Sequence, residues 1–255
     1  DDDTTGEELW KSDGTSSGTV MVKDINLGTG PSFLDHLTAF GNTLYFNAND
    51  GTGSGNRLWK SDGTSTGTVH VGGSFPSYLT VVGNTLYFQA YDGTHGYELW
   101  KSNGTGSVLV KDIRSGSGSS SPSQLTAIGN TLYFRADDGT NGIELWKSDG
   151  TSAGTVMVKD INSGSSSSNP EYLTAVGSTL YFQADDGTNG IELWKSDGTS
   201  AGTVMVKDIN SGSSSSNPEY LTAVGSTLYF TADDGTNGYE LWCDEINIEM
   251  AMSMS

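Results

Sequence analysis

Residues 136–182 read ADDGTNGIELWKSDGTSAGTVMVKDINSGSSSSNPEYLTAVGSTLYF, and residues 184–230 repeat them without a single change, a period of 48. Degenerate copies of this unit run through the rest of the chain. Leu-Trp occurs six times and accounts for all six tryptophans, at Leu9-Trp10, Leu58-Trp59, Leu99-Trp100, Leu145-Trp146, Leu193-Trp194 and Leu241-Trp242. Thr-Leu-Tyr-Phe begins five times, at Thr43, Thr85, Thr131, Thr179 and Thr227. The chain therefore contains five full repeats. We expect its fold to consist of copies of one structural unit placed side by side.

Each repeat predicts four short antiparallel β-strands. In the last complete copy the β-rich runs are residues 172–176, 179–184, 191–195 and 203–207. Gly177-Ser178 joins the first two runs and is typical of a two-residue hairpin turn. Polar loops rich in Asp, Gly, Thr and Ser separate the others, and no stretch has helical periodicity.

Both faces of such a sheet carry bulky side chains. Leu180 and Phe182 alternate with Thr179 and Tyr181, so each face must be covered by another sheet. Sheets stacked radially meet this need, and a period near 48 matches a propeller blade. We predict an all-β, five-bladed β-propeller of four-stranded antiparallel blades over residues 1–243. The tryptophans then form the core between blades, or alternatively a stacking platform for sugar rings.

The two ends of the chain carry complementary parts of a repeat. The chain begins with a third and a fourth strand, residues 8–24, and ends after a first, second and third, residues 220–242. Pairing these N-terminal and C-terminal strands in one blade would close the ring. One Leu-Trp strand is then surplus, either Leu9-Trp10 or Leu241-Trp242. The alternative is an open solenoid or a fragment of a longer array, which near-identical repeats also suit.

The composition excludes several classes of function. The 255 residues include 31 acidic and 12 basic side chains, a net charge of −19, and 34% apolar residues, which is enough for a sizeable core. No apolar run approaches the roughly 18 residues of a membrane helix, and the scattered bases form no patch for phosphates. We therefore predict no membrane span and no nucleic-acid partner. The single cysteine, Cys243, cannot form an internal disulfide, and the strong acidity favours an extracellular or cell-surface location.

A known repeat resembles this one. Glu192-Leu-Trp-Lys-Ser-Asp-Gly-Thr-Ser-Ala-Gly-Thr203, followed by Val206-Lys-Asp-Ile209, is similar to the bacterial repeat Glu-Leu-Trp-x-x-Asp-Gly-Thr-x-x-Gly-Thr…Val-Lys-Asp-Ile of large exported and surface proteins. The resemblance covers nearly the whole chain. It implies a propeller-like fold and a setting outside the cell, and it brings no catalytic residues. The second repeat departs most, with Arg57 in place of Glu and Val69-His-Val-Gly-Gly73 in place of Val-Met-Val-Lys-Asp.

The candidate ligand-binding residues lie where a loop between blades enters the first strand. An aromatic residue follows a carboxylate there, at Glu171-Tyr172 and Glu219-Tyr220. The longer polar loops should gather on the same face of a propeller. They would add the amides of Asn141, Asn189 and Asn237. Such a pocket resembles, in architecture alone, the sites of five-bladed animal lectins of the tachylectin type.

The same loops carry paired carboxylates: Asp137 and Asp138, Asp185 and Asp186, and Asp233 and Asp234. With the Gly turn and the Asn oxygen that follow, they supply hard oxygen ligands at short spacing, which predicts Ca²⁺ binding. No complete twelve-residue calcium loop is present. The alternative is that Asp-Gly and Asn-Gly form turns and that the charges are solvated. No other cofactor is predicted.

The sequence does not favour an enzyme. The histidines and arginines fall at non-equivalent positions of the repeat: His36, His70, His95, Arg57, Arg114 and Arg135. They suggest neither a metal triad nor a general base beside a nucleophile. Catalysis needs one unique constellation, whereas this chain repeats similar surfaces.

Repeated weak sites on one scaffold raise avidity for a repetitive target. We therefore predict a non-enzymatic, lectin-like protein that binds glycans or surface polysaccharide. The alternative is a structural subunit of a surface layer or filament, acting through protein contacts. In that role the tail, residues 244–255, matters because Ile246, Ile248, Met250, Met252 and Met254 alternate with other residues. The alternation predicts a strand that pairs with a neighbouring subunit; the other interpretation is a disordered end.

Overall fold

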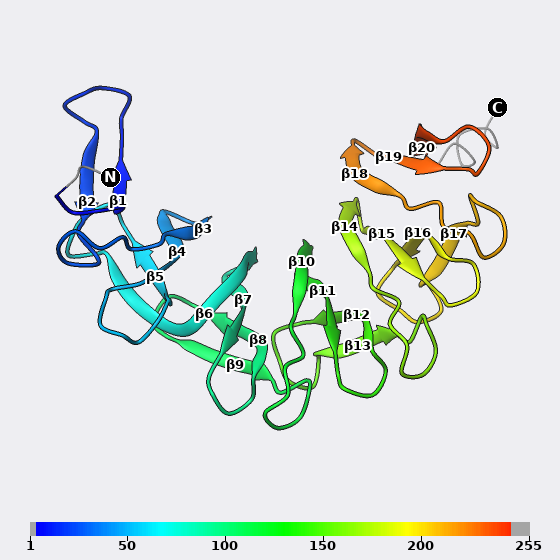
Figure 1. Cartoon of the computed structure of the whole chain (residues 1–255), viewed down its shortest axis with the longest axis horizontal. Helices are drawn as coiled ribbons and strands as arrows, with labels where there is room; N and C mark the ends of the chain where they lie inside the picture. The colour runs from blue at the N-terminus through cyan, green and yellow to red at the C-terminus, as the bar shows by residue number, and fades with distance from the viewer. Residues whose placement is uncertain (1–3, 246–255) are drawn as a thin grey trace. The chain divides into compact units, whose positions relative to one another are not determined.

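A computed structural model describes residues 4–245 as an all-β protein (Figure 1). Within that range no helix is long and apolar enough to cross a membrane. The chain divides into two compact units, Asp1–Ser121 and Pro122–Ser255. The last strand extends to residue 245, so two residues of the predicted tail belong to a sheet. The other tail residues, 246–255, lie outside the described part of the chain.

The described part of the first unit contains two sheets. Its strands are β1 (Leu9–Lys11), β2 (Val20–Lys23), β3 (Asp35–Phe40), β4 (Thr43–Ala48), β5 (Arg57–Ser61), β6 (Val69–Val82), β7 (Thr85–Tyr91), β8 (Tyr97–Ser102) and β9 (Ser107–Lys111). β1 and β2 pair with each other and correspond to the third and fourth strands of a repeat. The other seven form one antiparallel sheet in chain order, β3 to β9.

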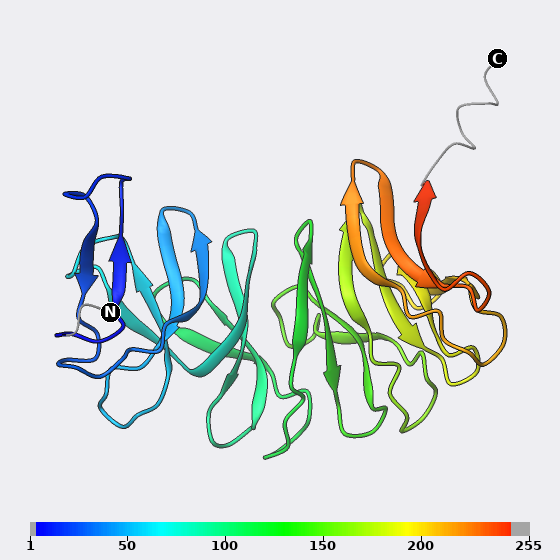
Figure 2. The same ribbon diagram turned by 45° about the horizontal axis from the view of Figure 1, so that its top comes forward.

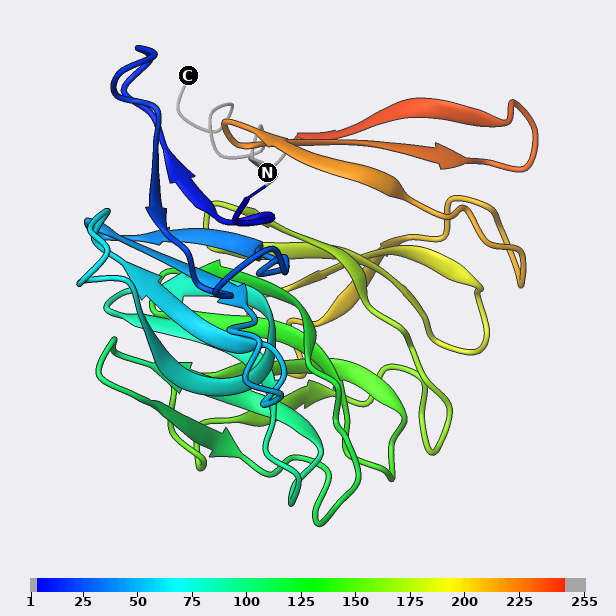
Figure 3. The ribbon, with the colours of Figure 1, turned by 60° about the vertical axis from the view of Figure 1, so that its left-hand side comes forward.

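β6 belongs to two repeats at once, and its long cyan strand can be followed in Figure 3. The first part of its 14 residues pairs with β5 and the second part with β7. The cause is a shorter connection, because the Leu-Trp spacing falls to 41 residues between Leu58 and Leu99. With the usual linker missing, the fourth strand of one repeat continues into the first strand of the next. Gly72 and Gly73 permit the crossing with φ of 99° and 71°, values that favour glycine.

The second unit confirms the predicted four-stranded antiparallel sheet (Figure 2). Its strands are β10 (Ser123–Ile128), β11 (Thr131–Asp137), β12 (Ile143–Ser148), β13 (Val156–Lys159), β14 (Glu171–Val176), β15 (Thr179–Asp185), β16 (Ile191–Ser196), β17 (Val204–Lys207), β18 (Glu219–Val224), β19 (Thr227–Asp233) and β20 (Tyr239–Glu245). Sheets β10–β13 and β14–β17 have four strands, and sheet β18–β20 has three among the described residues. The first strands β10, β14 and β18 neighbour one another.

The core lies between neighbouring sheets. Tyr133 and Leu145 of one sheet form a cluster with Leu180, Phe182 and Trp194 of the next. Trp194 is 6% exposed, and Trp59 and Trp146 are equally buried, which confirms the predicted place of these tryptophans between sheets. Burial of each such ring contributes roughly 2–3 kcal/mol.

Lysines bridge the same sheets from their edges. Lys159 of β13 places Nζ 5.7 Å from the ring centroid of Trp194 in the next sheet, and donates to the carbonyl of Thr203 at 2.8 Å. Lys147 of β12 donates to the carbonyl of Gly198 at 2.8 Å. Each cation–π contact of this kind contributes about 0.5–1 kcal/mol. These basic side chains therefore stabilise the stacking of sheets.

The closing blade predicted from the two chain ends is not formed among the described residues. β1 and β2 make one sheet, and β18 to β20 make another. The reason is that β20 occupies the edge of β19, with Trp242 of β20 opposite Phe230 of β19. This is the register of Trp194 opposite Phe182 in the preceding sheet. The surplus Leu241-Trp242 strand thus takes the edge that Leu9-Trp10 would need.

Candidate functional site

The first-strand segment of every repeat carries a residue with a left-handed backbone. These five residues, which we call the bulge residues, have φ between 52° and 57°: His36, Tyr78, Gln124, Tyr172 and Tyr220. A left-handed backbone costs a residue with a Cβ atom roughly 1–2 kcal/mol, and glycine avoids that cost. Most other left-handed positions of this chain are glycines. A larger side chain is therefore kept at all five positions although glycine would relieve the strain.

The left-handed residue belongs to a β-bulge. The pairing of β14 with β15 shifts register between Glu171 and Thr174, and β10 and β18 show the same irregularity. The bulge serves the contact between neighbouring first strands, since Thr174 Oγ1 donates to the carbonyl of Leu221 at 3.2 Å. It also leaves Tyr172 and Tyr220 37% and 72% exposed.

Polar groups converge beside Tyr172. Glu171 Oε1 accepts a hydrogen bond from Arg135 Nη1 at 2.6 Å, and its Oε2 accepts one from Gln183 Nε2 at 3.4 Å. Arg135 Nε also donates to Ser123 Oγ at 2.9 Å. Gln183 is only 8% exposed, and its Oε1 has no hydrogen-bond partner. We call Arg135, Glu171, Tyr172 and Gln183 the bulge site.

The first unit repeats part of this arrangement. Asn47 of β4 occupies the repeat position of Gln183, is 5% exposed, and has an Oδ1 atom without a hydrogen-bond partner. The bulge residues His36 and Tyr78 lie side by side, with ring centroids 6.3 Å apart. A buried amide oxygen without a donor costs about 1–3 kcal/mol. The same buried amide oxygen without a hydrogen-bond partner thus recurs in both units.

The structure brings together four of the predicted ligand-binding residues. Partial burial, with the negative charges of Glu219 and Glu171 and the neighbouring Tyr220, raises the pKa of Tyr172 above its ordinary value. The phenol of Tyr172 therefore keeps its proton at neutral pH and can donate a hydrogen bond. Sequence reasoning missed Arg135 and Gln183, although both stand at one repeat position of the second strand.

The predicted amide and metal ligands are engaged inside their own loops. Asp185 Oδ1 accepts the amide of Gly187 at 2.7 Å, and Asp186 Oδ1 accepts that of Asn189 at 2.8 Å. The side-chain amide of Asn189 donates to Asp186 Oδ2 at 2.8 Å. The same bonds recur in the two sister loops, around Asp137, Asp138 and Asn141 and around Asp233, Asp234 and Asn237.

These bonds identify the loop carboxylates as turn formers. The amide N–H groups of Asn237 and Thr236 hold the pKa of Asp234 below its usual value. Within residues 4–245 no three carboxylate, imidazole or thiol side chains gather as a metal site. The Ca²⁺ site stays a prediction.

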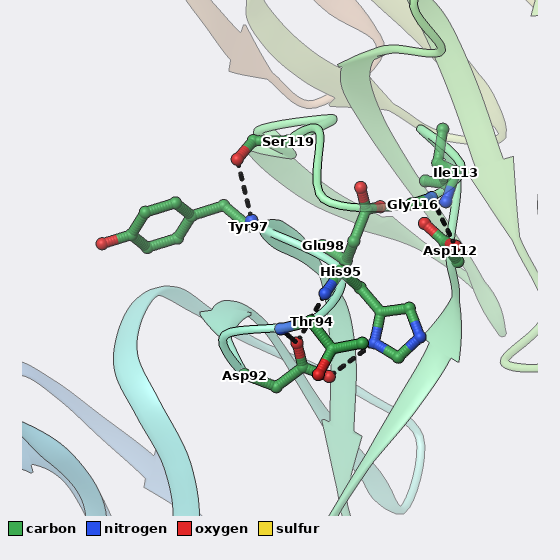
Figure 4. Close-up of polar contacts among 9 residues, drawn as sticks. All are labelled: Asp92, Thr94, His95, Tyr97, Glu98, Asp112, Ile113, Gly116 and Ser119. Atoms are coloured by element: carbon green, nitrogen blue, oxygen red, sulfur yellow. Dashed lines mark hydrogen bonds and ion pairs between the residues drawn. The ribbon is translucent and has the colours of Figure 1, made fainter.

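One loop replaces the asparagine with histidine (Figure 4). Asp92 Oδ2 lies 2.6 Å from His95 Nδ1, and Asp92 Oδ1 accepts the amides of Thr94 and His95, both at 2.8 Å. The hydrogen bond to Asp92 raises the pKa of His95 above 6.5, and the carboxylate charge adds to this effect. The loop therefore carries a titratable His–Asp pair that its asparagine-containing sisters lack.

We expect the raised pKa of His95 to disappear in Asp92→Asn. The folded state binds the proton more tightly than the unfolded state, so this pair contributes stability that is fully present below pH 6.5 and is lost as the pH rises through the folded-state pKa. NMR titration of the His95 ring compares the parent protein with Asp92→Asn, and the ring of His70 serves as the internal reference. An unchanged His95 titration in Asp92→Asn would show that the pair is not formed in solution.

The most buried charges of the repeat were missed by sequence reasoning. Glu144 is fully buried, and its Oε2 accepts from the Ile161 amide at 2.9 Å and from Ser168 Oγ at 2.6 Å. Its Oε1 accepts the Ser168 amide at 2.9 Å. We call these contacts the carboxylate clasp, which recurs at Glu8, Glu98 and Glu192. Burial raises the pKa of Glu144, although the hydrogen bonds to its oxygens oppose the shift.

The second repeat shows what the clasp is for. It lacks the usual linker between sheets, and Arg57 stands there in place of the glutamate. The glutamate is thus present where a linker has to be held and absent where β6 runs straight through. A sequence signal did exist, because Glu192 shares a strand face with the buried Trp194.

Comparison with known proteins supports the fold. No protein-family model matches the chain, and no curated protein matches its sequence. Among solved structures it resembles puromycin hydrolase, with 12% identity and a TM-score of 0.58 over 94% of this chain and 40% of that one. It also resembles prolyl oligopeptidase B from Galerina marginata, with 12% identity and a TM-score of 0.55 over 95% of this chain and 40% of that one.

A third structure gives the same result. Oligopeptidase B from Leishmania major is 11% identical, with a TM-score of 0.53 over 94% of this chain and 35% of that one. The chain spans about two fifths of the length of the two proteins named above. At such identities the likeness shows an all-β, propeller-like fold, and the hydrolytic activities in these names belong to the other proteins.

Proposed function

We propose that this chain is a non-enzymatic β-propeller protein that binds glycans or surface polysaccharide through its bulge residues. One observation carries the proposal: side chains, most of them aromatic, are kept at strained left-handed positions of every repeat. Backbone strain concentrates where a protein positions groups for binding or catalysis. The contact between first strands accounts for the bulge, but it does not account for an exposed tyrosine at its apex.

The chemistry of the bulge site suits a hydroxylated ring. Tyr172 offers an aromatic face on which the C–H groups of a sugar can stack, and its phenol can donate a hydrogen bond. Glu171 offers carboxylate oxygens as acceptors for vicinal hydroxyls, and the buried Gln183 donates to one of them at 3.4 Å. Arg135 holds Glu171 in place at 2.6 Å. A small number of placed polar groups beside an aromatic ring is the usual composition of a ligand site.

The repeats multiply this weak site. Bulge residues on successive sheets can engage successive residues of a polysaccharide, so the avidity exceeds the affinity of one site by orders of magnitude. Such a target belongs outside the cell, in keeping with the extracellular location that we propose from the acidity. Ca²⁺ is no part of the proposed contact.

We expect the triple variant Tyr78→Ala, Tyr172→Ala, Tyr220→Ala to lose roughly 100-fold or more in apparent affinity for a polysaccharide that the parent binds. The ligand is found by a glycan array, and calorimetry with the selected polysaccharide measures the loss. The matched control is Tyr239→Ala, an exposed tyrosine outside the bulges.

The array and the control separate two failures. A parent protein that binds no glycan on the array would overturn the proposed function. A parent that binds but loses as much affinity in Tyr239→Ala as in the triple variant would overturn the bulge site alone.

A further inference from the structure

The charges around the bulge site do not cancel. Arg135 Nη1 lies 2.6 Å from Glu171 Oε1, so the positive charge of Arg135 is already paired with Glu171. A second carboxylate, Glu219, stands at the same repeat position of the next first strand, β18. Within residues 4–245 no basic side chain forms an ion pair with Glu219. Two carboxylates and one guanidinium therefore leave a net negative charge at this place in the second unit.

Glu219 lies near the phenol of Tyr172. Their two first strands are in contact, because Thr174 Oγ1 of β14 donates to the carbonyl of Leu221 of β18 at 3.2 Å. Tyr172 stands two residues before Thr174, and Glu219 stands two residues before Leu221. After partial burial, the negative charge of Glu219 is the next cause that raises the pKa of Tyr172. The unpaired carboxylate is thus within electrostatic reach of a tyrosine that is 37% exposed.

The surroundings of Tyr172 suit a positively charged ligand. Tyr220 follows Glu219 in the chain and is a further neighbour of Tyr172. The face of a tyrosine ring attracts a cation through its quadrupole, and a carboxylate accepts a strong hydrogen bond from an ammonium group. The chain as a whole carries a net charge of −19, which draws a cationic polymer toward it. Ring faces and an unpaired carboxylate side by side therefore fit a ligand that joins an apolar ring surface to a positive charge.

We propose that the glycan bound at the bulge site is a cationic amino sugar, whose protonated amine binds Glu219 while its ring stacks on Tyr172. This inference rests on the proposed function and narrows it to one class of polysaccharide. The ammonium group donates a charge-assisted hydrogen bond to a carboxylate oxygen of Glu219. Glu171 keeps its ion pair with Arg135 and accepts hydroxyl groups of the same sugar.

The charge of the ligand sets the specificity of such a site. A neutral sugar would cover Glu219 without supplying a positive partner, and a carboxylate left unpaired on binding costs free energy. An acidic sugar would add like-charge repulsion from Glu219. The site should therefore favour a free amine over the same sugar with its amine acetylated, because acetylation removes the charge and keeps the ring.

Calorimetry with two matched oligosaccharides tests the proposal. The probes are a glucosamine oligomer, in mildly acidic buffer that protonates its amines, and the same oligomer with every amine acetylated. We expect the parent protein to bind the charged oligomer about 10-fold more tightly than the acetylated one. Glu219→Gln should lose about 10-fold in affinity for the charged oligomer and change its affinity for the acetylated one by less than about twofold.

Two controls separate the site from the general acidity of the chain. Glu240→Gln makes the same change of charge at an exposed glutamate outside the bulges and should leave both affinities unchanged. Oligolysine carries positive charge without a sugar ring, and Glu219→Gln should not alter its binding. Equal losses in Glu219→Gln and Glu240→Gln would show that only the overall charge acts, which overturns the assignment of Glu219.

The remaining outcomes distinguish this inference from the proposed function. A parent that binds the acetylated oligomer as tightly as the charged one, or binds only other glycans, would overturn the amino sugar and leave glycan binding in place. Oligolysine binding that depends on Glu219 to the same extent would assign the site to basic peptides instead. A parent that binds neither oligomer and no glycan on the array would overturn the proposed function, and this inference with it.

Discussion

Replacing Glu144 with alanine is expected to lower the free energy of unfolding by about 3–5 kcal/mol. The substitution leaves the Ile161 amide, the Ser168 amide and the Ser168 hydroxyl buried without their acceptor. Each orphaned donor costs about 1–3 kcal/mol in the buried position that Glu144 occupies. The linker between two sheets would lose its attachment, so the loss should include the docking of those sheets.

Glu240→Ala is the matched control for this loss. Glu240 stands at the same repeat position, opposite Ala232 as Glu192 is opposite Ala184, but it is exposed. Its replacement should change the unfolding free energy by less than about 0.5 kcal/mol. Urea titration followed by tryptophan fluorescence measures both variants. Equal losses in the two would show that the glutamate acts through its strand and that the clasp contributes nothing.

Leu193→Ala is expected to cost about 2–5 kcal/mol, whereas Leu241→Ala should cost less than about 0.5 kcal/mol. Both residues precede the Trp of their repeat, yet Leu193 is 1% exposed and Leu241 is 72% exposed. The first change opens a cavity between two sheets, within a cluster that includes Tyr181 and Leu228. The second removes a side chain that already faces water.

The pair is compared by urea midpoints at low protein concentration, where association does not contribute. Leu193→Val, which keeps most of the volume, should recover over half of the loss and separates the cavity from a strand defect. If Leu241→Ala lowers the unfolding free energy as much as Leu193→Ala does, then the face of β20 is covered in solution and Leu241 is not exposed there.

The repeat motif predicted much of the local structure correctly. The hairpin at Gly177-Ser178, the four strands of the two complete sheets and the burial of Trp59, Trp146 and Trp194 follow from patterns that local propensity and alternation control, whereas Trp10 is 42% exposed. The buried Glu144 could not be predicted in the same way, because a charge is buried only when distant donors, here on the linker 17 and 24 residues away, reach its oxygens. Arg135 joined the candidate site for the same reason, since its partner Glu171 lies on the neighbouring sheet, whereas Gln183 contacts Glu171 within one sheet.

The sequence by itself determined that this protein is built from repeated antiparallel sheets that must cover one another, and that a tyrosine follows a glutamate at Glu171-Tyr172 and Glu219-Tyr220, where the last two first strands begin. Local backbone preference and the need to bury two apolar faces are encoded in every repeat. Only the tertiary structure decided that β20 rather than β1 pairs with β19, because the two strands carry the same Leu-Trp motif and compete for one edge. It also decided the left-handed backbone of Tyr172, which arises from the bulge that links one first strand to the next. Both outcomes depend on contacts between repeats. Repeats with such similar sequences do not show which of them make these contacts.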